Sequence, residues 1–200
     1  MAQRAFLRAG MQALVANAPN CPSARSNDAD SREVRDVANV KEGARAPQFT
    51  LPAVNVDKIG LEGEKVALKD FQGEKVVVLY FYHRDNTKGC TLEAMGFRDL
   101  KGQFTRNGAV ILGVSTDDLD SHRKFSEKQK LNFPLLSDEG GAVADKYGVW
   151  QEKKMYGKTF QGVVRSTFVI DKSGKIARIW PKVNPEEHPR EVLDFVKALD

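Results

Sequence analysis

Cysteine is scarce in this chain: its 200 residues include only two, Cys21 and Cys90. Two thiols cannot form the disulfide framework that stabilises small secreted domains, so we expect the protein to work in a reducing compartment. Long apolar runs are absent as well. The longest, VVVLYFY at residues 76–82, is far shorter than the roughly 18 residues of a membrane-spanning helix and suits a buried strand. We therefore expect no membrane partner.

The chain also lacks a strong excess of one charge in its expected folded part. The formal net charge is +4, and residues 1–26 contribute +3 of it through three arginines and no acidic residue. The remaining residues carry 28 basic and 27 acidic side chains, a net charge of +1. A nucleic-acid-binding domain concentrates basic residues on its folded surface, so this distribution predicts no nucleic-acid partner.

The sequence contains no spacing of histidine, cysteine and carboxylate residues that is typical of a metal site. We expect His122 and His188 to be surface or helix-capping residues. No motif for an organic cofactor is present either. We therefore predict a protein that uses neither a metal ion nor an organic cofactor.

Residues 1–43 differ in composition from the rest and are interpreted as an N-terminal extension. MAQRAFLRAGMQALVANA contains arginine but no acid, and NAPNCPSARSNDADSRE resembles a linker rich in Pro, Ser, Asn and Asp. The start resembles an organelle transit peptide; a disordered extension and a misassigned start codon are the alternatives. The expected location is cytoplasmic, or mitochondrial or plastid if residues 1–26 are a transit peptide. Residues 44–200 are then the folded domain.

Strand and helix patterns alternate through the predicted domain. This order predicts an α/β fold with a mixed central sheet and helices on both faces. The loop after residues 76–82 should then reach the carboxyl edge of a central strand, a common place for active sites. The expected strands are 76–82, 109–115 and FPLLSD, and STFVIDKSGKIARIW is expected to form a hairpin. Helices are expected at 90–104, from the candidate N-caps Thr116-Asp117-Asp118 through Lys128, in GGAVADKYGV, and in HPREVLDFVKAL with Pro189 in its first turn.

Cys90 lies in a polar segment, DNTKGCTLEAMG, at the expected start of a helix. Unpaired backbone N–H groups and the positive end of the helix dipole stabilise a thiolate there and lower its pKa. Gly89 allows the backbone to approach a small ligand, and Thr87 supplies a hydroxyl. A nucleophilic thiolate with donors around it suits attack on a peroxide oxygen, which yields a sulfenic acid. The alternative is a buried, inert cysteine.

The segment LYFYHRDNTKGCTLEAMGFRD resembles the active site of the peroxiredoxins (AhpC/TSA-like thiol peroxidases), in the bacterioferritin-comigratory or peroxiredoxin Q subgroup. The family motif is Pro-x-x-x-Thr-x-x-Cys, and Thr87 and Cys90 occupy its last two fixed positions. FPLLSDEGG, DKYGVWQEKKMYGKTFQGVVRSTFVIDKSG and KVNPEEH match further blocks in the same order. The resemblance extends from about Lys41 to the C-terminus and implies a thioredoxin-like fold.

The resemblance also implies roles for individual residues. Cys90 would be the peroxidatic cysteine, and Thr87 would hydrogen-bond the peroxide and the sulfur. Arg165 matches the arginine that holds the thiolate and polarises the peroxide, because a guanidinium is always charged and offers fixed donors. Glu93 matches the residue that orients this arginine. Gly89 supports the site as described above.

Two departures from the family pattern bear on the mechanism. His83 replaces the motif proline; we expect a tolerated substitution near the pocket rim, or an imidazole that affects the local electrostatics. Met95 replaces the resolving cysteine that many members carry five residues after the peroxidatic one. The only internal candidate left for that role is Cys21, and we expect an external thiol to compete better.

The function predicted from the sequence is therefore a thiol peroxidase in antioxidant defence and cell redox homeostasis. It would reduce hydrogen peroxide and organic hydroperoxides by a one-cysteine cycle, with thioredoxin or glutathione and glutaredoxin as reductant. Two alternative functions use the same cysteine. The first is a cysteine hydrolase, in which Cys90 would pair with His83, His122 or His188. The second is a redox sensor or holdase, which would use oxidation of Cys90 as a switch without turnover. A monomer is favoured over a dimer.

Overall fold

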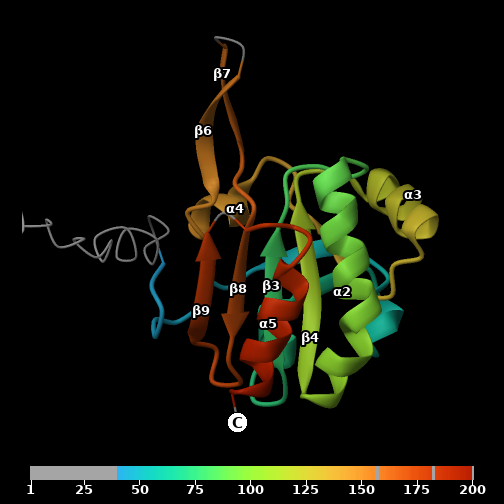
Figure 1. Ribbon diagram of the computed structural model, residues 1–200, viewed down its shortest axis with the longest axis vertical. Helices are drawn as coiled ribbons and strands as arrows, with labels where there is room; N and C mark the ends of the chain where they lie inside the picture. The colour runs from blue at the N-terminus through green and yellow to red at the C-terminus, as the bar shows by residue number, and fades with distance from the viewer. Residues whose placement is uncertain (1–39, 156–157, 182, 200) are drawn as a thin grey trace, which may run out of the picture.

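The computed structural model describes residues 40–155, 158–181 and 183–199 (Figure 1). Most of the predicted extension, including Cys21 and the whole candidate transit peptide, lies outside the described residues. The first described residues pack against the rest of the domain. Val40 is buried, and the Gly43 amide donates to the carbonyl of Ile176 at 2.7 Å. Residues 40–43 therefore already pack on the last strand of the sheet.

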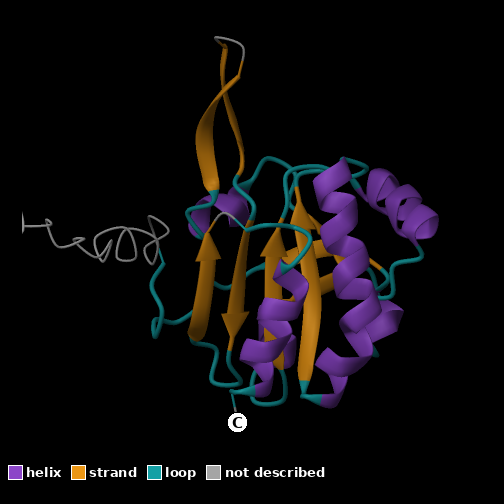
Figure 2. Ribbon diagram, viewed as in Figure 1, coloured by secondary structure: helices purple, strands orange, loops and turns teal. Residues whose placement is uncertain are grey.

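Two sheets and four α-helices make up the described fold (Figure 2). In the described residues no helix is both long and apolar enough to cross a membrane. The strands are β1 (Thr50–Val54), β2 (Lys65–Ala67), β3 (Val76–Phe81), β4 (Ala109–Ser115), β5 (Leu135–Ser137), β6 (Trp150–Met155), β7 (Lys158–Val163), β8 (Ser166–Ile170) and β9 (Ile176–Pro181). The helices are α2 (Lys88–Arg106), α3 (Leu119–Gln129), α4 (Ala142–Lys146) and α5 (His188–Lys197), with short 3-10 helices η1 (Val56–Ile59) and η2 (Leu68–Phe71).

The main sheet has seven strands in the order β2-β1-β5-β4-β3-β8-β9. Strand β3 lies between β4, with which it is parallel, and β8, with which it is antiparallel. The predicted mixed sheet is confirmed, and the strand that precedes Cys90 is a central one. Its carboxyl end, at Phe81, pairs with Val114 of β4 and Ser166 of β8.

Strand β3 is buried on both faces because alternate side chains enter two different cores. Val77, Leu79 and Phe81 pack with the residues of η2 and α4. Val78 and Tyr80 face the opposite way and pack with the apolar faces of α2, α3 and α5. Figure 2 shows α2 and α5 side by side across one face of the sheet. Helices cover both faces, as predicted.

The hairpin of β6 and β7 was not predicted from the sequence. It forms a separate two-stranded sheet that projects from the body of the domain (Figure 1). Charged and polar residues dominate both strands, in WQEKKM and KTFQGV. Strand prediction relies on apolar side chains at alternate positions, and this pattern is weak here. The hairpin ends just before Arg165.

Candidate active site

The loop between β3 and α2 places Cys90 in the first turn of α2. Thr87 precedes the helix in an extended conformation, and its carbonyl accepts from the Thr91 amide at 2.9 Å. Cys90 is the third helical residue, so it lies among the backbone N–H groups that have no partner within the helix. The helix begins two residues earlier than predicted, and the thiol is placed at its positive end.

The Cys90 sulfur is buried and contacts polar side chains. Arg165 Nη2 donates to Sγ at 3.2 Å, and His83 Nδ1 lies 3.3 Å from Sγ. The polar surroundings predicted for Cys90 are present, but the residue itself is only 1% exposed. Burial follows from the position of the thiol between the helix and the central strands, where Cys90 joins the core that lies under α2.

The surroundings of Cys90 lower its pKa. Burial raises the pKa of the thiol, but hydrogen bonds from His83 and Thr87, a backbone hydrogen bond at Arg84 and the charge of Arg165 outweigh it and bring the pKa to about 6. The thiolate, which is the nucleophilic form of cysteine, is therefore the main species at neutral pH.

Arg165 bridges Cys90 and Glu93. Its Nη1 donates to Glu93 Oε2 at 2.6 Å while Nη2 faces the sulfur, so the two bonds fix the plane of the guanidinium. Burial raises the pKa of the fully buried Glu93 to about 8; Arg165 opposes this shift, and the charge of Cys90 adds to it. The guanidinium is thus held between a buried carboxyl group and the sulfur.

Gly89 makes room for the arginine. A Cβ added at this position would lie 3.2 Å from Arg165 Nη2 and 3.5 Å from Pro185 Cγ. The first of these distances is tighter than ordinary van der Waals contact, so any larger residue would push the guanidinium away from the sulfur. The sequence led us to expect an approach of backbone to ligand at Gly89; the structure shows an approach of a side chain.

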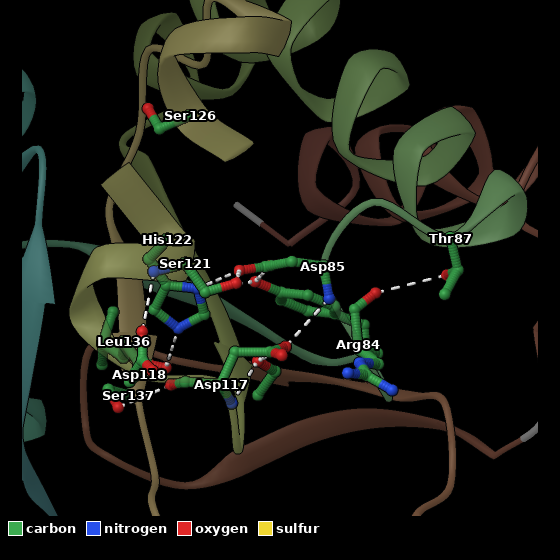
Figure 3. A network of polar contacts seen from close by, with 12 residues as sticks. Arg84, Asp85, Thr87, Asp117, Asp118, Ser121, His122, Ser126, Leu136 and Ser137 are labelled. Carbon is green, nitrogen blue, oxygen red and sulfur yellow. Dashed lines mark hydrogen bonds and ion pairs between the residues drawn. The ribbon is translucent and has the colours of Figure 1, made fainter. Parts of the chain in front are cut away.

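The hydroxyl of Thr87 lies near the thiolate and contributes to its low pKa. The same hydroxyl donates to the carbonyl of Arg84 at 3.2 Å, a contact drawn in Figure 3. A hydroxyl has a single proton, so the carbonyl and the thiolate are alternative acceptors for it. Thr87 therefore has a donor that can be redirected toward the sulfur or toward a ligand beside it.

A buried polar network anchors the loop that leads to Cys90 (Figure 3). Asp85 Oδ1 accepts from Tyr82 Oη at 2.8 Å, and Oδ2 accepts from Ser121 Oγ at 2.8 Å and faces His122 Nδ1 at 2.9 Å. The Asp85 amide donates to Asp117 Oδ2 at 2.9 Å. The loop before α2 is thus tied to the N-terminal end of α3.

His122 is a structural partner of Asp85, and its predicted surface position is wrong. The residue is fully buried, and Nε2 lies 3.2 Å from the carbonyl of Leu136, which can only accept. Nε2 therefore carries a proton, and the pair of Asp85 and His122 shares a second one. Burial raises the pKa of Asp85, but the hydrogen bond and charge of His122 outweigh burial and lower it.

His188 is also buried, at 1% exposure, so of its two predicted positions, surface or helix cap, the surface one is wrong. It begins α5, where Nε2 lies 2.8 Å from Thr167 Oγ1. Burial lowers the pKa of His188 to about 4, so the imidazole is neutral. In the described part of the chain, His83 is therefore the histidine that reaches the sulfur of Cys90.

The contact of His83 with the sulfur corresponds to the second of the two roles considered for this residue, an imidazole that affects the local electrostatics. One feature of the site was not expected from the sequence. It is Lys153 of β6, whose Nζ donates to the carbonyl of Val163 at 2.5 Å. Burial and the charge of Arg165 lower the pKa of Lys153, and the charge of Cys90 raises it. The unpredicted hairpin thus brings a cation near the site.

A family model described as the AhpC/TSA family matches residues 43–179. The chain is 43% identical to peroxiredoxin Bcp of Bacillus subtilis over 160 residues, which is 80% of this chain and 97% of the relative. It is 42% identical to peroxiredoxin Bcp of Escherichia coli over 158 residues, which is 79% of this chain and 96% of the relative.

Solved structures give the same result for the fold. The bacterioferritin comigratory protein of Xanthomonas campestris, described by its alkyl peroxide reduction activity, superposes with a TM-score of 0.68 and 38% identity. The match covers 75% of this chain and 90% of that one. The thioredoxin-like fold predicted from the sequence is confirmed.

Proposed function

The chain belongs to the AhpC/TSA family and is a peroxiredoxin of the bacterioferritin-comigratory type, a thiol peroxidase, and we propose that Cys90 is its peroxidatic cysteine. The observation that carries the proposal is the contact of Arg165 with both Cys90 Sγ and Glu93. This contact holds a fixed cation on a thiolate at a helix start, where an electron-rich sulfur and the donors for an oxygen leaving group are needed together.

The proposed reaction is a nucleophilic displacement at oxygen. The Cys90 thiolate attacks the terminal oxygen of the hydroperoxide, so that an S–O bond forms while the O–O bond breaks. Sulfur loses two electrons and becomes a sulfenic acid, and the other oxygen leaves as an alkoxide or hydroxide that takes up a proton. Peroxide and a thiol reductant are the substrates of this enzyme class.

The roles of the neighbouring side chains follow from their positions. Arg165 stabilises the thiolate and the charge that develops on the leaving oxygen, because its guanidinium stays protonated. Glu93 orients the guanidinium, and Gly89 leaves space for it. Thr87 turns its hydroxyl from the Arg84 carbonyl toward the sulfur or the bound peroxide.

We propose a one-cysteine cycle for reduction of the sulfenic acid. Met95 occupies the position on α2 at which many relatives carry the resolving thiol, and Cys21 is the only other cysteine in the sequence. A long tether gives a low effective concentration, so an external thiol should outcompete Cys21. Thioredoxin, or glutathione with glutaredoxin, would supply that thiol. Because Cys90 is buried, the first turn of α2 must open before this thiol can reach it.

The remaining proposals concern substrate, boundaries and location. Alkyl hydroperoxides and hydrogen peroxide are the proposed substrates, supported by the activity of the Xanthomonas relative. Residues 44–200 are the proposed catalytic domain, with residues 40–43 packed on it, and residues 1–43 an extension to it. A thiol-dependent cycle requires a reducing compartment, and the cytoplasm is proposed. The proposed assembly is a monomer.

Peroxide consumption with a supplied thiol reductant tests the proposal. The Cys90→Ser variant should lose all activity, because a serine hydroxyl is too weak a nucleophile at neutral pH. The matched control, Cys21→Ser, should keep the wild-type rate. More than a few per cent of activity left in the Cys90 variant would exclude this residue. Consumption that stops after one equivalent of peroxide in the wild type would instead indicate a sensor without turnover.

A further inference from the structure

The proposed reaction needs a proton donor beside the sulfur. The oxygen that leaves when the O–O bond breaks is a strongly basic alkoxide or hydroxide, and its departure is faster if a proton reaches it in the transition state. A group within hydrogen-bond reach of Cys90 Sγ is close to an oxygen that reacts with this sulfur. The donor should therefore be found among the side chains around Cys90.

Among the described residues, the side chains that interact directly with Sγ are Arg165, His83 and Thr87. Arg165 cannot fill the role, since a guanidinium does not give up its proton in proteins. The hydroxyl of Thr87 is an equally poor acid at neutral pH. Imidazole is the side chain that ordinarily gains and loses a proton between about pH 5 and 8. His83 alone joins this property to contact with the sulfur.

The position of His83 also suits repeated proton transfer. The residue is exposed although Cys90 is buried, so its ring connects the sulfur to solvent. Sγ lies 3.3 Å from Nδ1, and a thiolate can only accept, so Nδ1 is the nitrogen that carries the shared proton. The charged or titratable groups that interact with the Cys90 end of this pair are Arg165, Glu93 of α2, Lys153 of β6 and Tyr80 of β3.

We propose that His83 is the general acid of the peroxidase reaction, an inference that rests on Cys90 being the peroxidatic residue. The reactive form in this proposal is a Cys90 thiolate beside a His83 imidazolium, whose Nδ1 proton faces the sulfur. The thiolate takes the terminal OH of the peroxide as the O–O bond breaks. The imidazolium gives its proton to the leaving oxygen, which departs as an alcohol or as water. The products are the sulfenic acid and neutral His83, so atoms, electrons and charge balance.

The test compares two peroxides whose leaving groups differ in their need for a proton. Tert-butyl hydroperoxide releases a basic alkoxide, whereas peracetic acid releases acetate, which leaves without protonation. Both react with the same thiolate, so the ratio of their second-order rate constants does not depend on how much of Cys90 is ionised. The ratio is measured for the wild type, His83→Asn and His83→Gln, which keep a polar side chain but cannot act as an acid.

Both variants should react with tert-butyl hydroperoxide about 100-fold more slowly, at the lower end of typical general-acid effects. The rate with peracetic acid should change less than about threefold once it is corrected for the thiolate fraction. In the wild type the ratio should fall as the pH rises, and in the variants it should not. An unchanged ratio in both variants would overturn the role of His83. Cys90→Ser tests the peroxidatic role of Cys90 separately. Activity of this variant with either peroxide would contradict the role of Cys90, whereas an unchanged ratio in the His83 variants contradicts only the role of His83.

Discussion

Replacement of Arg165 by methionine should raise the pKa of Cys90. Methionine resembles the apolar stem of arginine, so the substitution mainly removes the guanidinium donor 3.2 Å from Sγ. A hydrogen bond to a charged group contributes about 1.5–3 kcal/mol, and one pKa unit corresponds to 1.36 kcal/mol, so the bond alone accounts for about one to two units.

Glu93 does not offset this change. Its pKa is about 8 even with the guanidinium 2.6 Å away, so the buried carboxyl group is already mostly protonated at pH 7 and has little negative charge to lose. Hydrogen bonds from His83 and Thr87 still lower the pKa of Cys90 in the variant. We therefore expect the lower end of the range, a Cys90 pKa near 7 in place of about 6.

A shift of this size changes the thiolate fraction little at neutral pH. The fraction at pH 7 falls from about 0.9 to about 0.5, which accounts for only a twofold loss in rate. The loss of a donor to the leaving oxygen costs far more, typically about a hundredfold or more. The peroxide step should therefore slow at least tenfold, and stabilisation of the transition state, not ionisation of Cys90, should dominate.

The measurement is the rate of Cys90 alkylation as a function of pH, followed by mass spectrometry, beside the second-order rate constant with peroxide. The wild type should show an alkylation midpoint near pH 6. Arg178→Met is the matched control, since this arginine lies on β9, is half-exposed and pairs with Glu42 at 3.8 Å. Equal midpoints in the wild type and the Arg165 variant would refute the reasoning, as would a midpoint that shifts in the control.

Two further predictions concern the oxidised enzyme and the anchor of its active-site loop. One equivalent of peroxide without added thiol should leave Cys90 as a sulfenic acid, which excess peroxide converts to the sulfinic acid, with Cys21 still free; a dominant disulfide between the two in the mass spectrum would contradict the one-cysteine cycle. Asp85→Asn should lower the free energy of unfolding in urea by about 3 kcal/mol, because it leaves a buried imidazole without its carboxylate. The exposed ion pair of Asp120 with Arg123 is the control: Asp120→Asn should cost less than about 1 kcal/mol, and equal losses in the two variants would show that the buried pair does not anchor the loop.

The sequence by itself determined the elements that depend on local patterns. The apolar run at residues 76–82 indicated a strand buried on both faces, and β3 is such a strand. The aspartates after β4 indicated a helix start, and Asp118 accepts from the Ser121 amide at 2.7 Å. Pro189 indicated the first turn of the last helix and lies there in α5. These features require only neighbouring residues, so a single segment contains the information.

The pairing of distant residues was decided by the tertiary structure. Glu93 and Arg165 are 72 residues apart, and the sequence linked them only through a resemblance to a family. Their contact arises because α2 and β8 flank the carboxyl end of β3, and Gly89 leaves the guanidinium a place beside the sulfur. The burial of His122 and His188 was missed for the same reason.

The sequence around a single histidine does not show whether the residue is buried or lies on the surface. His122 acquires Asp85 and the Leu136 carbonyl as partners only when α3 packs against the loop and β5. The β6–β7 hairpin was missed because its strands lack apolar alternation, and with it the cation of Lys153 near the thiolate. The sequence placed the nucleophile at the start of a helix by local rules. The charges and donors that determine its reactivity come from segments far along the chain, and only long-range packing brings them to the sulfur.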